Sequence, residues 1–257
     1  MNLSFQYIKT DHAKGLARIT LARPKHNVLN IEMMKELNAA LSSLATDAGL
    51  KCVVLSGEGP SWCAGVDVGE HRPEMVAEMM GAFNGIFETM EKIEVPLIAA
   101  VHGPCLGGGM ELAIACDIIV ASSKATFGQP EIRLGFFPPY AAIRLPQLVG
   151  PARAIEICAT GKIYSADEAR AMGLISQVAG EEAFGEAVES VAGSLLLSSP
   201  LIIRLNKRAV KGHIGMAFPQ ALAKVTDLFL NRLMKTEDTL EGINSFCEKR
   251  KPDWKNR

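Results

Sequence analysis

The sequence predicts an α/β fold that is followed by a mainly helical C-terminal region. Short apolar runs rich in β-branched residues alternate with longer segments whose apolar residues recur at helical spacing. From about residue 181 onward, the pattern is almost wholly helical. The chain has 257 residues, of which 48% are hydrophobic and 21% charged, so it can bury a substantial core.

The elements follow from local composition. Strands are expected where short apolar runs are bounded by turn residues, at 5–9, 16–21, 51–55, 97–101, 118–121 and 174–178. Helices are expected at 31–46, 75–93 and 110–116, because apolar residues there recur every three or four positions. Pro200 and Pro219 fall where two of the later helices would begin.

Charge and cysteine content narrow the functional class. The net charge is −1, so there is no basic excess to attract nucleic acid or an anionic membrane. The six cysteines are scattered without metal-ligand spacing and are expected to be reduced, mostly buried thiols. Without a charged leader or an apolar run of about 18 residues, the expected location is cytoplasmic, with no membrane association.

The most informative segment is the glycine turn at 103–111, Gly-Pro-Cys-Leu-Gly-Gly-Gly-Met-Glu. It follows the apolar run at 97–101 and leads into a predicted helix, whose first N–H groups lack intrahelical partners. These amides and the helix dipole favour negative charge near Gly108, and Glu111 lies one turn further along. The turn lacks the G-x-G-x-x-G fingerprint and the P-loop lysine, which argues against a nucleotide cofactor.

Two further segments strengthen this interpretation. The loop at 61–68, Ser-Trp-Cys-Ala-Gly-Val-Asp-Val, also follows an apolar run and supplies a second amide at Val66. The segment at 127–132, Phe-Gly-Gln-Pro-Glu-Ile, supplies Glu131 from a loop bounded by proline. Together with the glycine turn, these segments favour stabilisation of an oxyanion over an ordinary strand-to-helix turn.

On these motifs the chain resembles the crotonase superfamily, also called the enoyl-CoA hydratase/isomerase family. The resemblance covers nearly the whole chain and depends on the order and spacing of its motifs. These are ARITLARP at 17–24, NVLN at 27–30, CAGVD at 63–67, HGPCLGGGMELAIACD at 102–117, FGQPEIRLG at 127–135, TG at 160–161, SADEA at 165–169 and EGINSFCEKR at 241–250.

The resemblance implies a spiral of β-β-α repeats at residues 1–195 and a helical oligomerisation region at 196–257. It implies a homotrimer or homohexamer, and apolar residues at helical spacing in the C-terminal region fit a partly buried surface: Leu222, Val225, Leu228, Phe229 and Leu233. It also implies an acyl-CoA thioester substrate, with CoA as part of the substrate and no metal or redox cofactor.

The same resemblance assigns the site residues of a hydro-lyase. The Val66 and Gly108 amides form an oxyanion hole for the thioester oxygen. Glu131 carries out the principal proton transfer, while Glu111 positions and activates water. A double-bond isomerase of the same superfamily is the alternative. The paired glutamates favour hydration over it, since isomerisation can proceed with one carboxylate. A non-catalytic, RNA-binding member is a third possibility, which the charge balance disfavours.

The segment after Glu131 departs from the usual short-chain hydratase pattern. A glycine-rich turn is replaced by Leu-Gly-Phe-Phe-Pro-Pro-Tyr-Ala-Ala-Ile-Arg-Leu-Pro at 134–146. Phe136, Phe137 and Tyr140 are therefore candidates to shape the acyl pocket, although aromatic residues beside proline are also ordinary packing residues. The segment resembles the branch that hydrates cyclohexa-1,5-diene-1-carbonyl-CoA, which makes a cyclic dienoyl group the sharpest substrate hypothesis.

The remaining candidates rest on position alone. Ala64 and Asp67 are expected to contact substrate, with loop stabilisation as the alternative role for Asp67. His71 either reaches the substrate or packs beside the next helix, and His102 supports the glycine turn. Four basic residues are candidates to bind the CoA phosphates: Arg23, Lys25, Lys249 and Lys251.

Overall fold

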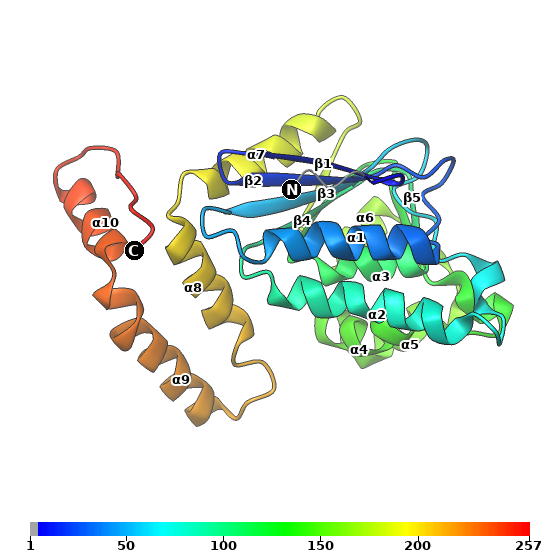
Figure 1. Ribbon diagram of the computed structural model, residues 1–257. Coiled ribbons are helices and arrows are strands. Elements are labelled where there is room, and N and C mark those ends of the chain that lie inside the picture. Colours follow the sequence, from blue (N-terminus) through cyan, green and yellow to red (C-terminus); the bar gives the residue numbers. More distant parts are fainter. Residues whose placement is uncertain (1–4) are drawn as a thin grey trace.

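A computed structural model describes residues 5–257 and confirms the α/β fold (Figure 1). The main sheet has six strands in the order β1-β2-β3-β4-β6-β9. β1 and β2 form an antiparallel hairpin, and every other pair in this sheet is parallel. The strands are β1 (Ile8–Ala13), β2 (Leu16–Leu21), β3 (Cys52–Gly57), β4 (Leu97–Val101), β6 (Ile118–Ser122) and β9 (Gln177–Ala179).

Helices cover both faces of the main sheet. On one face lie α1 (Ile31–Leu44), α2 (Val76–Lys92) and α3 (Gly108–Ala115), and on the other lies α7 (Phe184–Leu196) (Figure 1). Alternate residues of β3 show the division, since Val53 and Leu55 join the large cluster while Val54 packs toward α7. Burial on both faces explains why the central strands are apolar without alternation.

The repeats of the chain also contribute strands to a second, three-stranded sheet. It contains β5 (Pro104–Leu106), β7 (Thr126–Gly128) and β8 (Ile163–Ser165) in that order. Thus β4 is followed by β5 and α3, and β6 is followed by β7 and a short 3₁₀ helix, η2 (Pro130–Leu134). This succession is the β-β-α repeat that was predicted. The helices α4 (Pro139–Val149), α5 (Pro151–Thr160) and α6 (Ala166–Ala171) complete the core.

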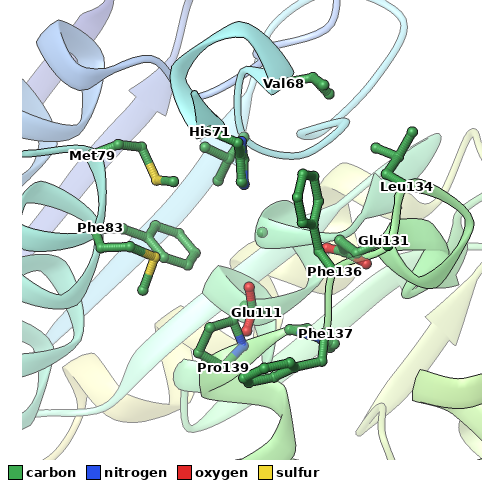
Figure 2. Close-up of a pocket in the computed structure, with 15 residues that line it drawn as sticks. Val68, His71, Met79, Phe83, Glu111, Glu131, Leu134, Phe136, Phe137 and Pro139 are labelled. Carbon is green, nitrogen blue, oxygen red and sulfur yellow. The ribbon is translucent and has the colours of Figure 1, made fainter. Parts of the chain in front are cut away.

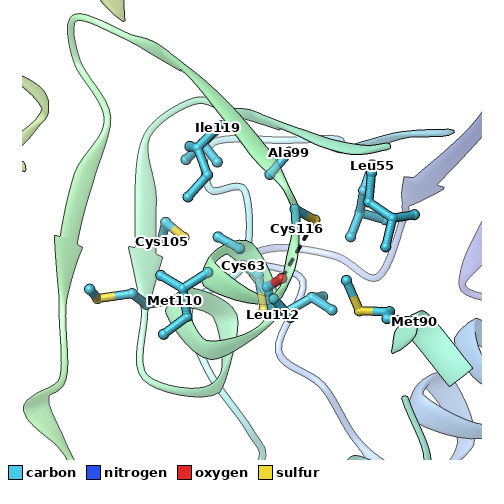
Figure 3. Packing of buried hydrophobic residues seen from close by; sticks show 14 of the residues in the cluster. Leu55, Cys63, Met90, Ala99, Cys105, Met110, Leu112, Cys116 and Ile119 are labelled. Carbon is cyan, nitrogen blue, oxygen red and sulfur yellow. Dashed lines mark hydrogen bonds between the residues drawn. The ribbon is translucent and has the colours of Figure 1, made fainter. Parts of the chain in front are cut away.

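Helix α3 is buried along its whole length. Met110 and Leu112 pack among thiols and aliphatic side chains (Figure 3), and the Cys116 Sγ lies 3.7 Å from the Leu112 carbonyl oxygen, which accepts its hydrogen bond. All six cysteines are free, and most are buried as predicted: four are buried, Cys158 is half-buried and Cys247 is exposed. A helix enclosed on all sides gives its N-terminus a fixed position.

The C-terminal region consists of α8 (Pro200–Lys211), α9 (Phe218–Asn231), η3 (Leu233–Lys235) and α10 (Glu237–Cys247). In Figure 1, α9 and α10 lie on the far side of α8 from the main sheet. Lys207 of α8 anchors this region to the core, because its Nζ lies 2.6 Å from Asp117 Oδ2 and 2.8 Å from the Val95 carbonyl oxygen.

A membrane-spanning helix was not expected. Among residues 5–257, no single helix is long and apolar enough to cross a bilayer, although α7 and α8, bent by 103°, together pass that test of length and composition.

Two predicted strands are displaced. The first was expected at 5–9, but β1 begins at Ile8 and runs into polar residues, because hairpin pairing with β2 determines its extent. The last was expected at 174–178, but β9 begins at Gln177, since the apolar Leu174 and Ile175 pack in the core ahead of the strand.

Candidate active site

A cavity of about 260 Å³ opens between the start of α2 and the segment that leads from η2 into α4. Val66, Gly108, Glu111 and Glu131 all line it, so the structure brings together the two amides and two carboxylates singled out in the sequence. Figure 2 shows both glutamates facing the same space.

The register of two parallel segments explains why Val66 and Gly108 converge. Cys63 pairs with Cys105 in a parallel bridge, and the Leu106 N–H donates to the Cys63 carbonyl at 3.0 Å. Val66 and Gly108 each lie three residues beyond the bridged cysteines, so they occupy equivalent positions. A Cβ built on Gly108 would lie 2.5 Å from Val66 Cγ2, which shows how closely the two segments approach. Only glycine fits at this point.

Both amides are available to a ligand. Gly108 is the first residue of α3, so its N–H has no intrahelical acceptor. The residues on either side of Val66, rather than Val66 itself, hold its loop in place. Leu29 N–H donates to Gly65 O and Asp67 N–H donates to Leu29 O, each at 2.8 Å. Within residues 5–257, the Val66 N–H takes no part in this backbone ladder. Two fixed donors beside a helix N-terminus form an oxyanion hole.

Glu111 projects from the first turn of α3 and is only 2% exposed. Its Oε1 accepts the Ala141 N–H at 2.8 Å, and the Tyr140 amide also donates to it, so the carboxyl group lies at the N-terminus of α4. Pro138 and Pro139 have no N–H, which leaves Tyr140 and Ala141 as the nearest free donors of that helix. Burial raises the Glu111 pKa to about 7 despite these hydrogen bonds.

Glu131 lies in the first turn of η2 and faces the glycine turn. A Cβ on Gly107 would lie 2.4 Å from Glu131 Oε1, so the absence of a side chain at 107 makes room for the carboxylate. Gly107 also has a φ of 55°, which favours glycine independently. Burial raises the Glu131 pKa to about 7, and its own backbone amide opposes the rise.

Two neighbouring carboxyl groups with a pKa near 7 can exchange roles as proton donor and acceptor at neutral pH. Besides burial, the charge of Glu131 contributes to the raised pKa of Glu111. Together with the oxyanion hole, they can add a proton and a hydroxyl group to a conjugated double bond.

Aromatic and sulfur-containing side chains form the walls of the cavity. Figure 2 shows Met79 and Phe83 of α2 on one side, with Phe136 and Leu134 on the other. Phe136 stacks on the His71 ring with centroids 4.7 Å apart and an interplanar angle of 17°. His71 is held in turn by donating its Nδ1–H to the Asp67 carbonyl oxygen at 2.9 Å. This stacked pair gives the cavity a flat aromatic wall.

The other predicted substrate contacts have different surroundings. Phe137 lines the cavity and is 72% exposed. The Tyr140 ring does not line it but stacks on Phe87 at 3.8 Å, so only the Tyr140 backbone reaches Glu111. Ala64 and Asp67 also lie outside the lining. Asp67 instead caps the 3₁₀ helix η1 (Val68–His71), with its Oδ1 accepting the Gly69 N–H at 2.9 Å.

The predicted CoA phosphate ligands are separated in the structure. Arg23 is engaged internally, donating to the Val28 carbonyl oxygen at 2.7 Å and lying 3.7 Å from Asp67. Lys25 is exposed in the loop that follows β2. Lys249 and Lys251 are exposed and follow the end of α10 in the sequence. Within one chain, the structure does not bring these four side chains together around the cavity.

Sequence reasoning missed several residues that line the cavity. Met79, Met80 and Phe83 were expected only as the apolar face of a helix, and nothing in that pattern distinguishes a cavity wall from a core contact. His71 could be recognised from its place just after the Val66 loop. Among residues 5–257, no group of three His, Cys, Asp or Glu side chains is arranged to hold a metal ion.

Residues 11–257 match the family described as enoyl-CoA hydratase/isomerase. The chain is 36% identical to cyclohexa-1,5-dienecarbonyl-CoA hydratase of Thauera aromatica, over 95% of this chain and 94% of that protein. It is 34% identical to crotonyl-CoA hydratase of Syntrophomonas wolfei, over 98% and 99%. The crystal structure of enoyl-CoA hydratase from Bacillus anthracis superposes with a TM-score of 0.93 at 32% identity, covering 98% of this chain and 100% of that one.

Proposed function

Because the chain belongs to the enoyl-CoA hydratase/isomerase family of enzymes, we propose that it is a hydro-lyase that adds water to the conjugated double bond of an enoyl-CoA thioester. The observation that carries this proposal is the convergence of Glu111, Glu131 and the Val66 and Gly108 amides on one cavity. Relatives named as hydratases support the same reaction.

In the proposed mechanism, the thioester oxygen accepts hydrogen bonds from the Val66 and Gly108 amides. Attack of water on the double bond moves charge onto this oxygen, and in other enzymes loss of one such donor costs about 2.7–4 kcal/mol of transition-state stabilisation. Glu111 holds and activates the water, and Glu131 carries out the principal proton transfer. The proton taken from water balances the proton given to carbon, so water addition involves no net oxidation or reduction and is proposed to need no redox cofactor.

Isomerisation is the alternative within the same family. It needs proton removal and return, which one carboxylate can perform. The buried pair Glu111 and Glu131, each with its pKa raised to about 7, favours hydration because water addition uses two groups. The RNA-binding alternative has less support, since the chain carries a net charge of −1.

For the acyl group, we propose a cyclic dienoyl thioester such as cyclohexa-1,5-diene-1-carbonyl-CoA. The flat wall formed by Phe136 stacked on His71, opposite Phe83, suits a planar ring. The similarity to the Thauera aromatica hydratase supports this choice, while the comparable similarity to crotonyl-CoA hydratase keeps a linear acyl group as the competitor.

A panel of linear and cyclic enoyl-CoA thioesters, with product identification, tests both the proposed hydration and the proposed cyclic acyl group. We expect the cyclic diene to be hydrated with a kcat/KM at least about tenfold above that of crotonyl-CoA, since one or two methylene equivalents of contact are worth roughly that much. Replacing Phe136 or Phe137 by Ala should narrow the gap. Phe184→Ala, on the opposite face of the sheet, is the matched control.

Rapid turnover of crotonyl-CoA with no conversion of the cyclic diene would contradict the cyclic substrate and leave the hydratase proposal intact. No conversion of any enoyl-CoA would contradict the hydratase proposal itself. Double-bond migration without water addition would favour the isomerase.

We also propose that residues 196–257 mediate assembly into a homotrimer or homohexamer. Large apolar side chains on α9 and α10 are exposed in the single chain, including Leu222, Phe229 and Phe246. Apolar exposure of this extent indicates a surface that is covered by another protein. A second copy of this chain is the proposed partner, as expected for the family.

A further inference from the structure

Gln129 is a buried polar residue beside the cavity that belongs neither to the oxyanion hole nor to the pair of glutamates. It lies between β7 and η2, is 0% exposed, and is not part of the cavity lining. Burying a side-chain amide costs free energy unless the amide is hydrogen-bonded. A fully buried glutamine next to a candidate catalytic residue therefore calls for a partner.

The partner of Gln129 is the carboxylate of Glu131. With the amide nitrogen turned toward Glu131, that nitrogen lies 3.1 Å from both Oε1 and Oε2. The opposite orientation would place the amide oxygen against two acceptors, so only the first orientation pairs donor with acceptor. One amide thus reaches both oxygens of the group that is proposed to transfer the proton.

The backbone makes this contact rigid. Gln129 and Glu131 flank Pro130, whose ring fixes its own φ and restricts the residue before it. Gln129 is held at the end of β7, where Gly107 N–H donates to the Gly128 carbonyl at 2.9 Å. The same Gly107 leaves the space that Glu131 Oε1 occupies. The glycine turn, the amide and the carboxylate are therefore positioned as one unit.

We propose that Gln129 is a positioning residue for Glu131, whose amide holds both carboxylate oxygens and so fixes the direction in which Glu131 takes and returns a proton. The inference rests on the proposed function, because it assigns Glu131 the proton transfer. Donation by the amide also stabilises the ionised carboxylate, which opposes the effect of burial. Three other titratable groups share these surroundings: Glu111 of α3, His71 of η1 and Cys158 of α5.

The test is Gln129→Met, which keeps the length and apolar volume of the side chain but removes the donor. We expect kcat for hydration to fall at least about tenfold with little change in KM, a part of the range for acid–base catalysis. Because the ionised form of Glu131 loses a donor, its pKa should rise. The acid limb of the pH profile should then move upward by about one pH unit. A purely structural role would not move that limb.

Gln129→Asn is the second variant, since it keeps an amide but withdraws the nitrogen by about one methylene. It should move the acid limb of the pH profile in the same direction, and it replaces Gln129→Met in the test if that variant does not fold. Gln147→Met, at an exposed position of α4, is the matched control. A folded Gln129 variant with wild-type kcat and an unchanged pH profile would overturn the inference.

An infrared titration of the Glu131 carboxylate separates this inference from the proposed function, because it needs no substrate. Isotope-labelled glutamate, with Glu131→Gln for assignment, should report a higher Glu131 pKa in Gln129→Met than in the unmodified chain. A wild-type protein inactive on every enoyl-CoA would contradict the proposed function alone. Equal carboxylate titrations in the two proteins would contradict the Gln129 contact alone.

Discussion

Replacing Glu111 by Gln should stabilise the folded protein at alkaline pH. The carboxyl group is 2% exposed, and burial raises its pKa from 4.5 to about 7. Because the folded-state pKa lies above the unfolded value, the contribution of Glu111 to the free energy of unfolding is fully present below pH 4.5. That contribution is lost as the pH rises through 7. At about 1.36 kcal/mol per pKa unit, the loss at high pH is at most about 3 kcal/mol.

The glutamine introduced at position 111 remains neutral and can still accept the Ala141 N–H through its oxygen, so the variant should not suffer this loss. Urea unfolding between pH 5 and 8.5, at one protein concentration, measures the difference. Glu111→Gln should gain up to about 3 kcal/mol over the wild type at pH 8.5 but less than about 1 kcal/mol at pH 5. Glu74→Gln, at an exposed carboxylate, is the control. A difference that is absent or independent of pH would refute the argument from burial.

Three other predictions follow from the site and the C-terminal region. Gly107→Ala should lower hydration at least about 100-fold, because its Cβ would lie 2.4 Å from Glu131 Oε1. Gly173→Ala, which has a positive φ but no neighbour within 4 Å, controls for backbone strain, and equal losses in both would refute the contact. Hydration should be fastest near pH 7 and fall on either side, since both carboxyl groups have a pKa of about 7, and a flat profile from pH 5 to 9 would contradict this. Light scattering should show a trimer or hexamer that Phe246→Asp weakens, whereas a stable monomer at micromolar concentration would contradict the proposed assembly.

The long elements could be predicted because their patterns are strong. The strands at 16–21 and 97–101 have the expected bounds, and α1 and α2 end within two residues of the expected positions. The strands β5, β7 and β8 were missed, since segments of three residues are too short for alternation to be visible. Of these, β5 nevertheless sets the register that brings Val66 beside Gly108, because its Cys105 pairs with Cys63.

The site could be predicted only in part, for a related reason. Glu111 and Glu131 lie in motifs whose order identifies the family, so their convergence on one cavity was expected. The cavity walls come from side chains such as Phe83, whose apolar pattern is the same whether it faces a cavity or the core. Tyr140 shows the opposite case, since this aromatic residue of the segment at 134–146 packs on Phe87 and contributes its backbone to the site.

The central claim is that Glu111 and Glu131 act together on water opposite the oxyanion hole. The most direct test is the rate of hydration by purified Glu111→Gln and Glu131→Gln, measured on the best substrate of the panel, with circular dichroism to establish folding. We predict that each variant is folded and loses at least about 100-fold in kcat, the lower range for acid–base catalysis. Near-normal turnover by either folded variant would remove that residue from the mechanism and contradict the claim.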